Sequence, residues 1–194
     1  MSIDKHDLFR NAIPGFVFLV VILSFYATTE SLDRISNGQG ALLGLIAGLP
    51  LGFIIQNMYR CLHVWFEQKT IDKKESALVD DKKINGTLRE KASYLWFQIS
   101  KSTHKAWKER IDFLYSYMHA LGASALAIGL AIIVMWVVKY HFDWTPIVRY
   151  TMGIWVVIAG IFCLLRERVK ENCWISTKIL FLEDKTTSLS EPPK

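Results

Sequence analysis

The sequence predicts an all-α integral membrane protein with four transmembrane helices and a helical cytoplasmic hairpin. Apolar residues make up 52% of the 194 residues, and they are concentrated in four long blocks rather than spread along the chain. A block of about 17 to 20 apolar residues, folded as a helix, crosses roughly 30 Å of hydrocarbon. The Lys and Arg residues lie mostly outside these blocks, in a pattern that predicts an orientation.

The first two blocks, residues 12–28 and 40–59, contain no Asp, Glu, Lys or Arg. The third and fourth, residues 121–140 and 147–165, contain only Lys139 and Arg149. A core helix of a soluble protein would keep a polar face, so we expect each block to span a membrane. The first block could instead be a signal peptide, but no clear cleavage site follows it, and we expect a retained helix.

The basic residues predict which side each connection occupies. Two of the 23 Lys and Arg lie before the first block, twelve between the second and third blocks, and six after the fourth. Because cytoplasmic segments carry an excess of Lys and Arg, we expect a multi-pass protein of the bacterial inner (plasma) membrane with both termini cytoplasmic. The predicted segments are a cytoplasmic N-terminal tail (1–11), transmembrane helices 1 and 2 (12–59), the cytoplasmic helical hairpin (60–118), transmembrane helices 3 and 4 (119–165) and a cytoplasmic C-terminal tail (166–194).

The hairpin is predicted from its pattern of apolar and charged residues. Its charged middle, "DKKESALVDDKKING", ends in Asn85-Gly86 and indicates a turn or a mobile tip. From Thr87 onward, apolar residues recur at helical spacings, and Thr87 to Glu90 resembles a capping box. We therefore expect a long amphipathic helix that runs into the third span. The C-terminal tail should begin helical and end disordered in "EDKTTSLSEPPK".

A stripe of glycines marks one face of the second span. Gly40, Gly44, Gly48 and Gly52 are each four residues apart, so they lie on one side of a helix. In lipid, small residues let helix backbones approach closely, which favours a packing surface or oligomer interface here. The third span offers a small-residue complement in Ala123, Ala127 and Ala131. The stripe could pack within one chain, pack between chains, or line a pore, and Pro50 within it predicts a kink.

Two further sets of residues are candidates for binding. Gln56 and Asn57 are the most polar pair inside a span, and they could form interhelical hydrogen bonds or a permeation filter. The segment around "KSTHKAWKER" mixes aromatic and basic side chains, which suits a solvated cationic face beside the membrane, a protein-docking surface or, least favoured, a nucleic-acid surface. The candidate partner- or headgroup-binding residues are Trp96, Phe97, Lys101, Lys105, Trp107, Lys108 and Arg110.

No catalytic, cofactor-binding or metal-binding motif is present. The five His residues show no metal-ligand spacing with one another or with the three Cys residues. Phosphate-binding loops and hydrolase motifs are also missing from the sequence. We therefore expect no enzyme activity and no cofactor, and we expect the three cysteines to be structural thiols rather than a disulfide framework.

The segment "NAIPGFVFLVVILSFY", followed by "GALLGLIAGLPLGFIIQNMYRCLHVW", and the four-span layout resemble the small membrane subunits of bacterial antiphage systems. Among these, the chain is similar to the KwaA family, the membrane component of the Kiwa system. The resemblance implies a homo-oligomer that senses or reports phage-induced membrane events and recruits a cytosolic partner. The membrane accessory proteins of type VI CRISPR loci are similar in size and span count. Neither resemblance assigns functional residues to this chain.

These observations lead to one expected function and one alternative. We expect a non-enzymatic, oligomeric inner-membrane scaffold or sensor of antiviral defence, whose hairpin recruits a cytosolic effector protein. Its expected partners are further copies of itself, with a tetramer as one candidate size, the effector and membrane lipids, without direct nucleic-acid binding. The alternative is a pore-forming effector that depolarises the membrane, although spans without central charges disfavour a selective channel.

Overall fold

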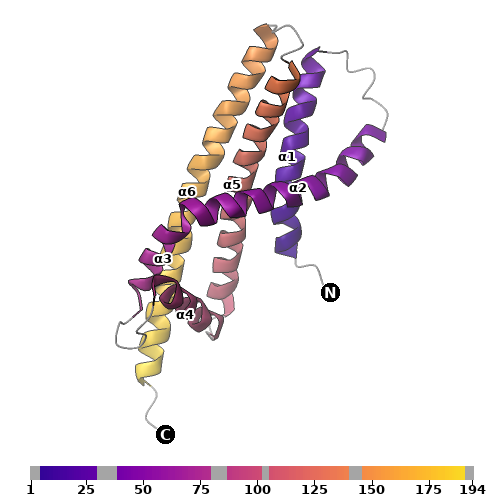
Figure 1. Ribbon diagram of the computed structural model, residues 1–194. Coiled ribbons are helices and arrows are strands. Elements are labelled where there is room, and N and C mark those ends of the chain that lie inside the picture. The colour runs from indigo at the N-terminus through magenta and orange to yellow at the C-terminus, as the bar shows by residue number, and fades with distance from the viewer. Residues whose placement is uncertain (1–4, 30–38, 80–86, 102–104, 140–145, 191–194) are drawn as a thin grey trace. The chain divides into compact units, whose positions relative to one another are not determined.

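The computed structural model describes residues 5–29, 39–79, 87–101, 105–139 and 146–190, with the side chains near several helix ends left out of the description. Six helices account for nearly all of these residues, and no strand occurs among them (Figure 1). They are α1 (Lys5–Thr29), α2 (Gln39–Phe66), α3 (Gln68–Ser76), α4 (Leu88–Lys101), α5 (Lys105–Lys139) and α6 (Pro146–Ser190). The predicted all-α class is confirmed.

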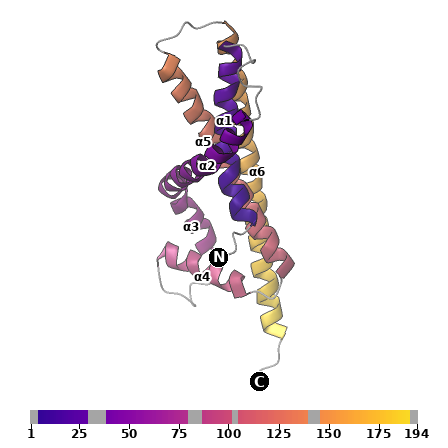
Figure 2. The same ribbon diagram turned by 90° about the vertical axis from the view of Figure 1, so that its right-hand side faces the viewer.

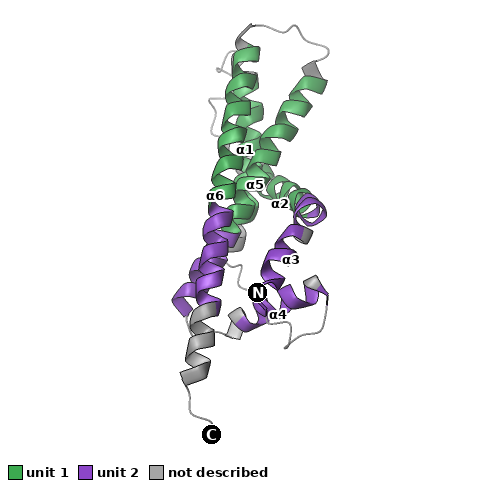
Figure 3. Cartoon of the chain, turned by 90° about the vertical axis from the view of Figure 1, so that its left-hand side faces the viewer, with its two compact units in different colours: residues 1–60, 116–168 green, residues 61–115, 169–194 purple. Residues whose placement is uncertain are grey.

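The chain forms two compact units, which Figure 3 shows in different colours. Unit 1 comprises Met1–Arg60 and Ser116–Arg168, and unit 2 comprises Cys61–Tyr115 and Val169–Lys194. Helices α2, α5 and α6 each contribute residues to both units. The unit boundaries lie close to the ends of the predicted spans, but the position of a membrane on the chain stays a prediction.

Two helices are long and apolar enough to cross a membrane among the residues that the structure describes. They are Lys105–Val137 within α5 and Val148–Phe181 within α6. In α1 the corresponding apolar stretch, Arg10–Phe25, is shorter, and the first residues of α2 lie outside the described side chains. The structure therefore supports a membrane protein weakly, and the number of four spans stays a prediction.

The core of unit 1 lies between α1, α5 and α6. Its buried members are Val21, Phe25, Ile128, Ala131 and Val148. A short hydrogen-bond chain crosses the same region, because Trp155 Nε1 donates to Ser24 Oγ (2.7 Å) and Ser24 Oγ donates to the carbonyl of Val21 (2.7 Å). The indole N–H is thus satisfied inside an apolar environment, as a buried tryptophan requires.

Helix α2 crosses α1, as Figures 1 and 2 both show. The crossing is very close: a Cβ on Gly15 would overlap the carbonyl oxygen of Gly48, and a Cβ on Gly52 would overlap the carbonyl oxygen of Asn11. Backbone thus meets backbone at this point, which only glycine allows. Two members of the predicted glycine stripe therefore pack within the chain, against α1.

The complement that the sequence suggested for this stripe was different. Ala123, Ala127 and Ala131 are fully buried in α5, but the atoms nearest to Gly48 and Gly52 belong to α1. The surroundings of Gly40 and Gly44 lie outside the described residues. Pro50 lies inside a helix that continues unbroken from Gln39 to Phe66.

Unit 2 contains α3, α4, the first turns of α5 and the last turns of α6, around its own core. The buried core residues are Val79, Leu95, Ile111, Cys173 and Leu180, and α3 packs against α4. The predicted capping box is confirmed: Thr87 N donates to Glu90 Oε2 (2.6 Å), and Glu90 N donates to Thr87 Oγ1 (3.3 Å). Thr87 donates to this carboxylate from its backbone N–H and also from its hydroxyl (Oγ1 to Oε2, 2.9 Å), and these two hydrogen bonds lower the pKa of Glu90.

Three expectations about unit 2 need correction. Residues 72–76 were expected in a turn or mobile tip, but they belong to helix α3, in which Asp72 and Glu75 are buried. The single long helix expected from Thr87 is divided into α4 and α5, and residues 102–104 between them lie outside the description. The tail was expected to end disordered, but α6 continues as far as Ser190.

Candidate functional site

Unit 1 contains a buried arginine where α2, α5 and α6 supply polar side chains. Arg166 Nε donates a hydrogen bond to the Tyr59 hydroxyl (2.7 Å), and its Nη1 donates to Glu167 Oε1 (2.6 Å). The guanidinium also lies 5.7 Å from the centre of the Tyr59 ring. Burying a guanidinium is costly unless it is paired and hydrogen-bonded. The contacts with Tyr59 and Glu167 offset this cost for Arg166.

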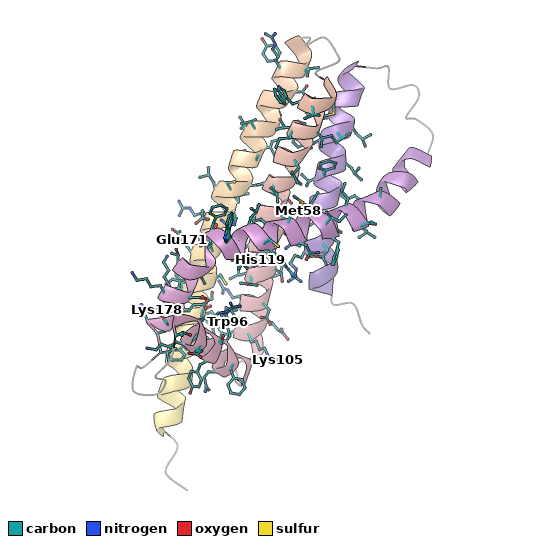
Figure 4. The ribbon with its side chains drawn as sticks, in the orientation of Figure 1. Met58, Trp96, Lys105, His119, Glu171 and Lys178 are labelled. Atoms are coloured by element: carbon teal, nitrogen blue, oxygen red, sulfur yellow. The ribbon has the colours of Figure 1, made fainter. Side chains whose placement is uncertain are left out.

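Tyr59 is held in place from the α5 side. Its ring meets the His119 ring edge-on, with 5.7 Å between the ring centres. A Cβ on Gly122 would overlap the Tyr59 ring, so the ring lies directly against the backbone of α5. Figure 4 labels His119 on α5. Tyr59, His119 and Arg166 therefore form a polar group inside unit 1, and sequence reasoning missed it because the three residues are far apart along the chain.

Gln56 and Asn57, the polar pair predicted for interhelical bonding, behave differently from one another. Asn57 Nδ2 donates to the carbonyl of Phe53 (2.9 Å), which belongs to its own helix. Gln56 is 1% exposed. Among the residues that the structure describes, no hydrogen-bond partner reaches Gln56 Nε2, Gln56 Oε1 or the equally buried Ser124 Oγ. The predicted interhelical hydrogen bond is therefore not found for Asn57 and has no described partner at Gln56.

Unit 2 contains a buried carboxyl group with an unusual pKa. Trp96 Nε1 donates to Glu75 Oε2 (2.9 Å), which joins α4 to α3. The pKa of Glu75 is raised to about 7, mainly by burial; the hydrogen bond from Trp96 opposes this rise, and the nearby Asp72 carboxylate adds a smaller contribution to it. A carboxyl group that titrates near neutrality is a candidate functional group. The sequence did not indicate the buried carboxyl group of Glu75, because the segment "DKKES" has the composition of an exposed turn.

A second polar contact in unit 2 joins Glu67, the residue between α2 and α3, to α6. Lys170 Nζ donates to Glu67 Oε2 (3.0 Å), and His63 Nε2 lies 3.8 Å from the same oxygen. His63 is buried, whereas Glu67 and Lys170 are partly exposed. This ion pair sets which face of the last turns of α2 points inward.

The predicted docking residues are divided between the core and the surface of unit 2. Trp96 and Trp107 pack against the core of unit 2, and Figure 4 labels Trp96 beside α4. Phe97, Lys105 and Arg110 are exposed, and Lys108 is partly buried. The side chain of Lys101 lies outside the description.

The two tryptophans of this set therefore have a structural role in the core. Arg110 lies over the Trp107 ring at 5.4 Å, which satisfies a cation–π geometry. Phe97, Lys105 and Arg110 are the exposed members of this set, and they could bind a partner.

Other kinds of site were sought among the described residues. No group of three His, Cys, Asp or Glu side chains there could hold a metal ion. Cys61 and Cys163 are exposed free thiols, and Cys173 is buried. One open hollow of about 420 Å³ lies on α6 alone, lined by Arg149, Tyr150, Gly153, Ile154, Val157 and Ile158.

Comparisons with known proteins add no relative to this description: no family model, no curated protein and no solved structure matches the chain. The functional interpretation therefore depends on the geometry and the sequence of this chain.

Proposed function

We propose that the chain is a non-enzymatic, oligomeric scaffold or sensor of the inner membrane, with four spans, both termini cytoplasmic and a role in antiphage defence. Its helical unit 2 would lie in the cytoplasm and recruit a soluble effector protein. One observation carries the proposal: unit 2 has a core of its own and still exposes aromatic side chains among basic ones. A folded unit with this kind of surface suits protein docking.

The membrane part of the proposal is supported by the two long apolar helices within α5 and α6. It is further supported by the distribution of Lys and Arg, which favours a cytoplasmic location for residues 60–118 and for both tails. In the most apolar 18-residue window of α6 only 6% of the residues are buried within the chain, against 44% in that of α5. Lipid or further copies of the chain would cover this part of α6, and an oligomer is one way to do so.

The docking surface that we propose lies on α4 and the start of α5. Phe97 is 51% exposed, and Lys105 and Arg110 are exposed in the same unit. Lys105 pairs only loosely with Glu109, at 3.9 Å between exposed groups, and such pairs contribute little. An effector with an acidic surface and an apolar contact would complement these side chains.

Co-expression with the product of a neighbouring gene tests the recruitment. The soluble protein should move to the membrane fraction with the wild-type chain, and it should stay soluble with the variant Lys101→Glu, Lys105→Glu, Lys108→Glu. The control variant Arg89→Glu, Lys178→Glu changes exposed basic residues of the same unit and should recruit normally. If the triple variant recruits as well as the wild type, the docking assignment is wrong; if its oligomer size changes, this surface is an assembly element.

A pore-forming effector is the second candidate. It is favoured by the buried polar side chains of Gln56 and Ser124, for which no described residue supplies a hydrogen bond. Ion flux across proteoliposomes that contain only this protein separates the two functions. Flux from the pure protein would support the pore, and its absence would support the scaffold.

A further inference from the structure

The last turns of α2 expose large aromatic side chains in unit 2. Trp65 is 82% exposed and Phe66 is 71% exposed, and their ring centres are 5.4 Å apart in an edge-on contact. Leu62 is also exposed, and residues three and four apart lie on one helix face. These three residues form an apolar surface, which we call the anchor face.

The orientation of the anchor face is set by the opposite side of the helix. His63 is buried, and Glu67, which accepts a hydrogen bond from Lys170 at 3.0 Å, lies next to it in space. The burial of His63 and the ion pair of Glu67, the residue directly after α2, hold the end of this helix in place within unit 2. Turning Trp65 inward would require breaking them, so the exposure of Trp65 and Phe66 follows from the packing of the helix.

The neighbouring helix α3 presents a positive surface. Its two acidic residues, Asp72 and Glu75, are buried, whereas Lys73 and Lys74 are exposed. Among the described side chains of α3, the exposed charges are therefore all positive. Aromatic side chains beside lysines are typical of the cytoplasmic interface of membrane proteins, because the rings enter the headgroup layer and the lysines attract anionic lipids.

We infer that Leu62, Trp65 and Phe66, together with Lys73 and Lys74, bind the anionic phospholipid surface of the cytoplasmic leaflet. This inference rests on the proposed membrane topology. In that topology the second span ends at Tyr59, and Trp65 lies about 9 Å further along the helix axis. Helix side chains lean toward the helix N-terminus, which here is the direction of the bilayer. The Trp65 and Phe66 rings therefore reach back into the headgroup layer.

The experiment places an environment-sensitive fluorophore on single cysteines in the full-length chain. Cys61, Cys163 and Cys173 are first replaced by Ser, and the thermal stability of this background is checked against the wild type. Single-cysteine variants Trp65→Cys and Phe97→Cys are labelled and reconstituted in phosphatidylcholine vesicles with and without phosphatidylglycerol. Quenching is then measured with nitroxides attached near the lipid headgroups, with nitroxides attached deep in the acyl chains, and with aqueous iodide. A third variant, Val156→Cys, reports the hydrocarbon, because Val156 is exposed on the apolar part of α6.

The label at position 65 should be quenched by the headgroup-level nitroxides and protected from iodide, whereas the label at position 97 should show the reverse. Adding Lys73→Gln and Lys74→Gln should lower the ratio of inserted to free segment by about fivefold for each removed lysine, and only in vesicles with phosphatidylglycerol. Iodide quenching at position 65 as strong as at position 97 would overturn the inference. Protection from both quenchers would also overturn it, because a protein would then cover the face.

The control at position 156 separates this inference from the proposed topology. If the label at position 156 is quenched by deep nitroxides and the label at position 65 is not quenched by lipid, the anchor face fails and the membrane protein stands. If neither label senses lipid, the proposed topology itself is wrong.

Discussion

Glycines occupy two contrasting settings in unit 1. Where α2 crosses α1, a Cβ on Gly15 or Gly52 would overlap the backbone of the other helix. On α6, a Cβ on Gly153 or Gly160 would meet no atom of the described residues within 4 Å. The same residue type therefore belongs to a closed contact in one region and to an open surface in the other.

The contrast shows which glycines are packed by contacts within a single chain. Glycine costs about 1 kcal/mol relative to alanine inside a helix, and at the α1–α2 crossing the close approach of two backbones offsets this cost. On α6 no contact with a described residue offsets it. The open glycines, the exposed Val156 and Val157 and the hollow at Gly153 together make α6 the surface that lipid or a further copy would cover.

The largest effect is expected from one substitution made in both regions. Gly52→Ala places a methyl group against the carbonyl oxygen of Asn11, which cannot rotate away, so it should destabilise the subunit by about 1–3 kcal/mol or more. Gly153→Ala meets open space and should stabilise the helix by up to about 1 kcal/mol. The measurement is the midpoint of thermal unfolding in mild detergent. Equal shifts for the two variants would remove the distinction between the regions.

Gly48→Ala sharpens the same test. A Cβ on Gly48 would lie 3.0 Å from the Phe16 ring, a side chain that can move. The loss of stability should therefore be smaller than for Gly52→Ala, although both glycines belong to one stripe. A larger loss at Gly48 than at Gly52 would mean that the crossing point is misplaced.

Unit 2 offers a buried and an exposed carboxyl group for the next comparison. The pKa of Glu75 is raised from 4.5 to about 7, so between these values the unfolded chain has lost a proton that the folded chain keeps. The free energy of unfolding should therefore fall as the pH rises from about 4.5 to about 7. Glu75→Gln keeps an acceptor for Trp96 and should remove this fall, which stabilises the protein above pH 7 by up to about 3 kcal/mol.

Thermal unfolding across this pH range, compared with Glu171→Gln on the exposed side of α6, checks the expectation. Parallel slopes for the wild type and Glu75→Gln would show that Glu75 does not titrate in this range.

Substitutions of a buried and an exposed tyrosine form the next matched pair, with a somewhat smaller expected effect on stability. Tyr59→Phe removes the hydroxyl that accepts the hydrogen bond from buried Arg166, so we expect a loss of about 1–3 kcal/mol. Tyr150→Phe changes an exposed residue of α6 and should be close to neutral. Unfolding midpoints in detergent test both, and an equal effect at the two positions would argue against a structural role for the Arg166–Tyr59 contact.

The smallest effect is expected at Gln56. Gln56→Met removes a buried carboxamide for which no described residue supplies a hydrogen bond, and it approximately keeps the side-chain volume. The stability should change by less than about 1 kcal/mol and could rise, because burying an unpaired amide is unfavourable. A loss clearly above that value would reveal a hydrogen-bond partner of Gln56. Unchanged stability with lost ion flux would instead support the pore.

The sequence predicted the features that depend on local pattern and composition. Thr87 and Glu90 were recognisable as a capping box because both halves of the motif lie within four residues, and the apolar lengths of α5 and α6 were visible as uninterrupted blocks. The partner of Gly52 was not predictable, since Gly15 is a single glycine in α1 with no repeat to mark it. Helix α3 was missed because Glu75 is buried against Trp96, a contact between residues that are distant along the chain.

In the candidate site, too, local patterns were predictable from the sequence and contacts between distant residues were not. Exposure of Phe97 and Lys105 agrees with the amphipathic pattern of the hairpin, whereas Trp96 and Trp107 were assigned to a docking surface and lie against the core. Composition does not distinguish a tryptophan that covers a core from one that binds a partner. The group formed by Tyr59, His119 and Arg166 required the three-dimensional structure, because it joins three helices that the chain order separates.

The orientation of the chain in a membrane is the claim on which the scaffold, the docking surface and the anchor face depend. Single cysteines at Ser36, Lys82 and Asp143 in the cysteine-free background, treated in intact cells with a maleimide that cannot cross the membrane, test it directly. The account predicts labelling at positions 36 and 143, and labelling at position 82 only after the cells are opened. Labelling of position 82 from outside, or protection of position 36 or 143 in intact cells, would contradict the account.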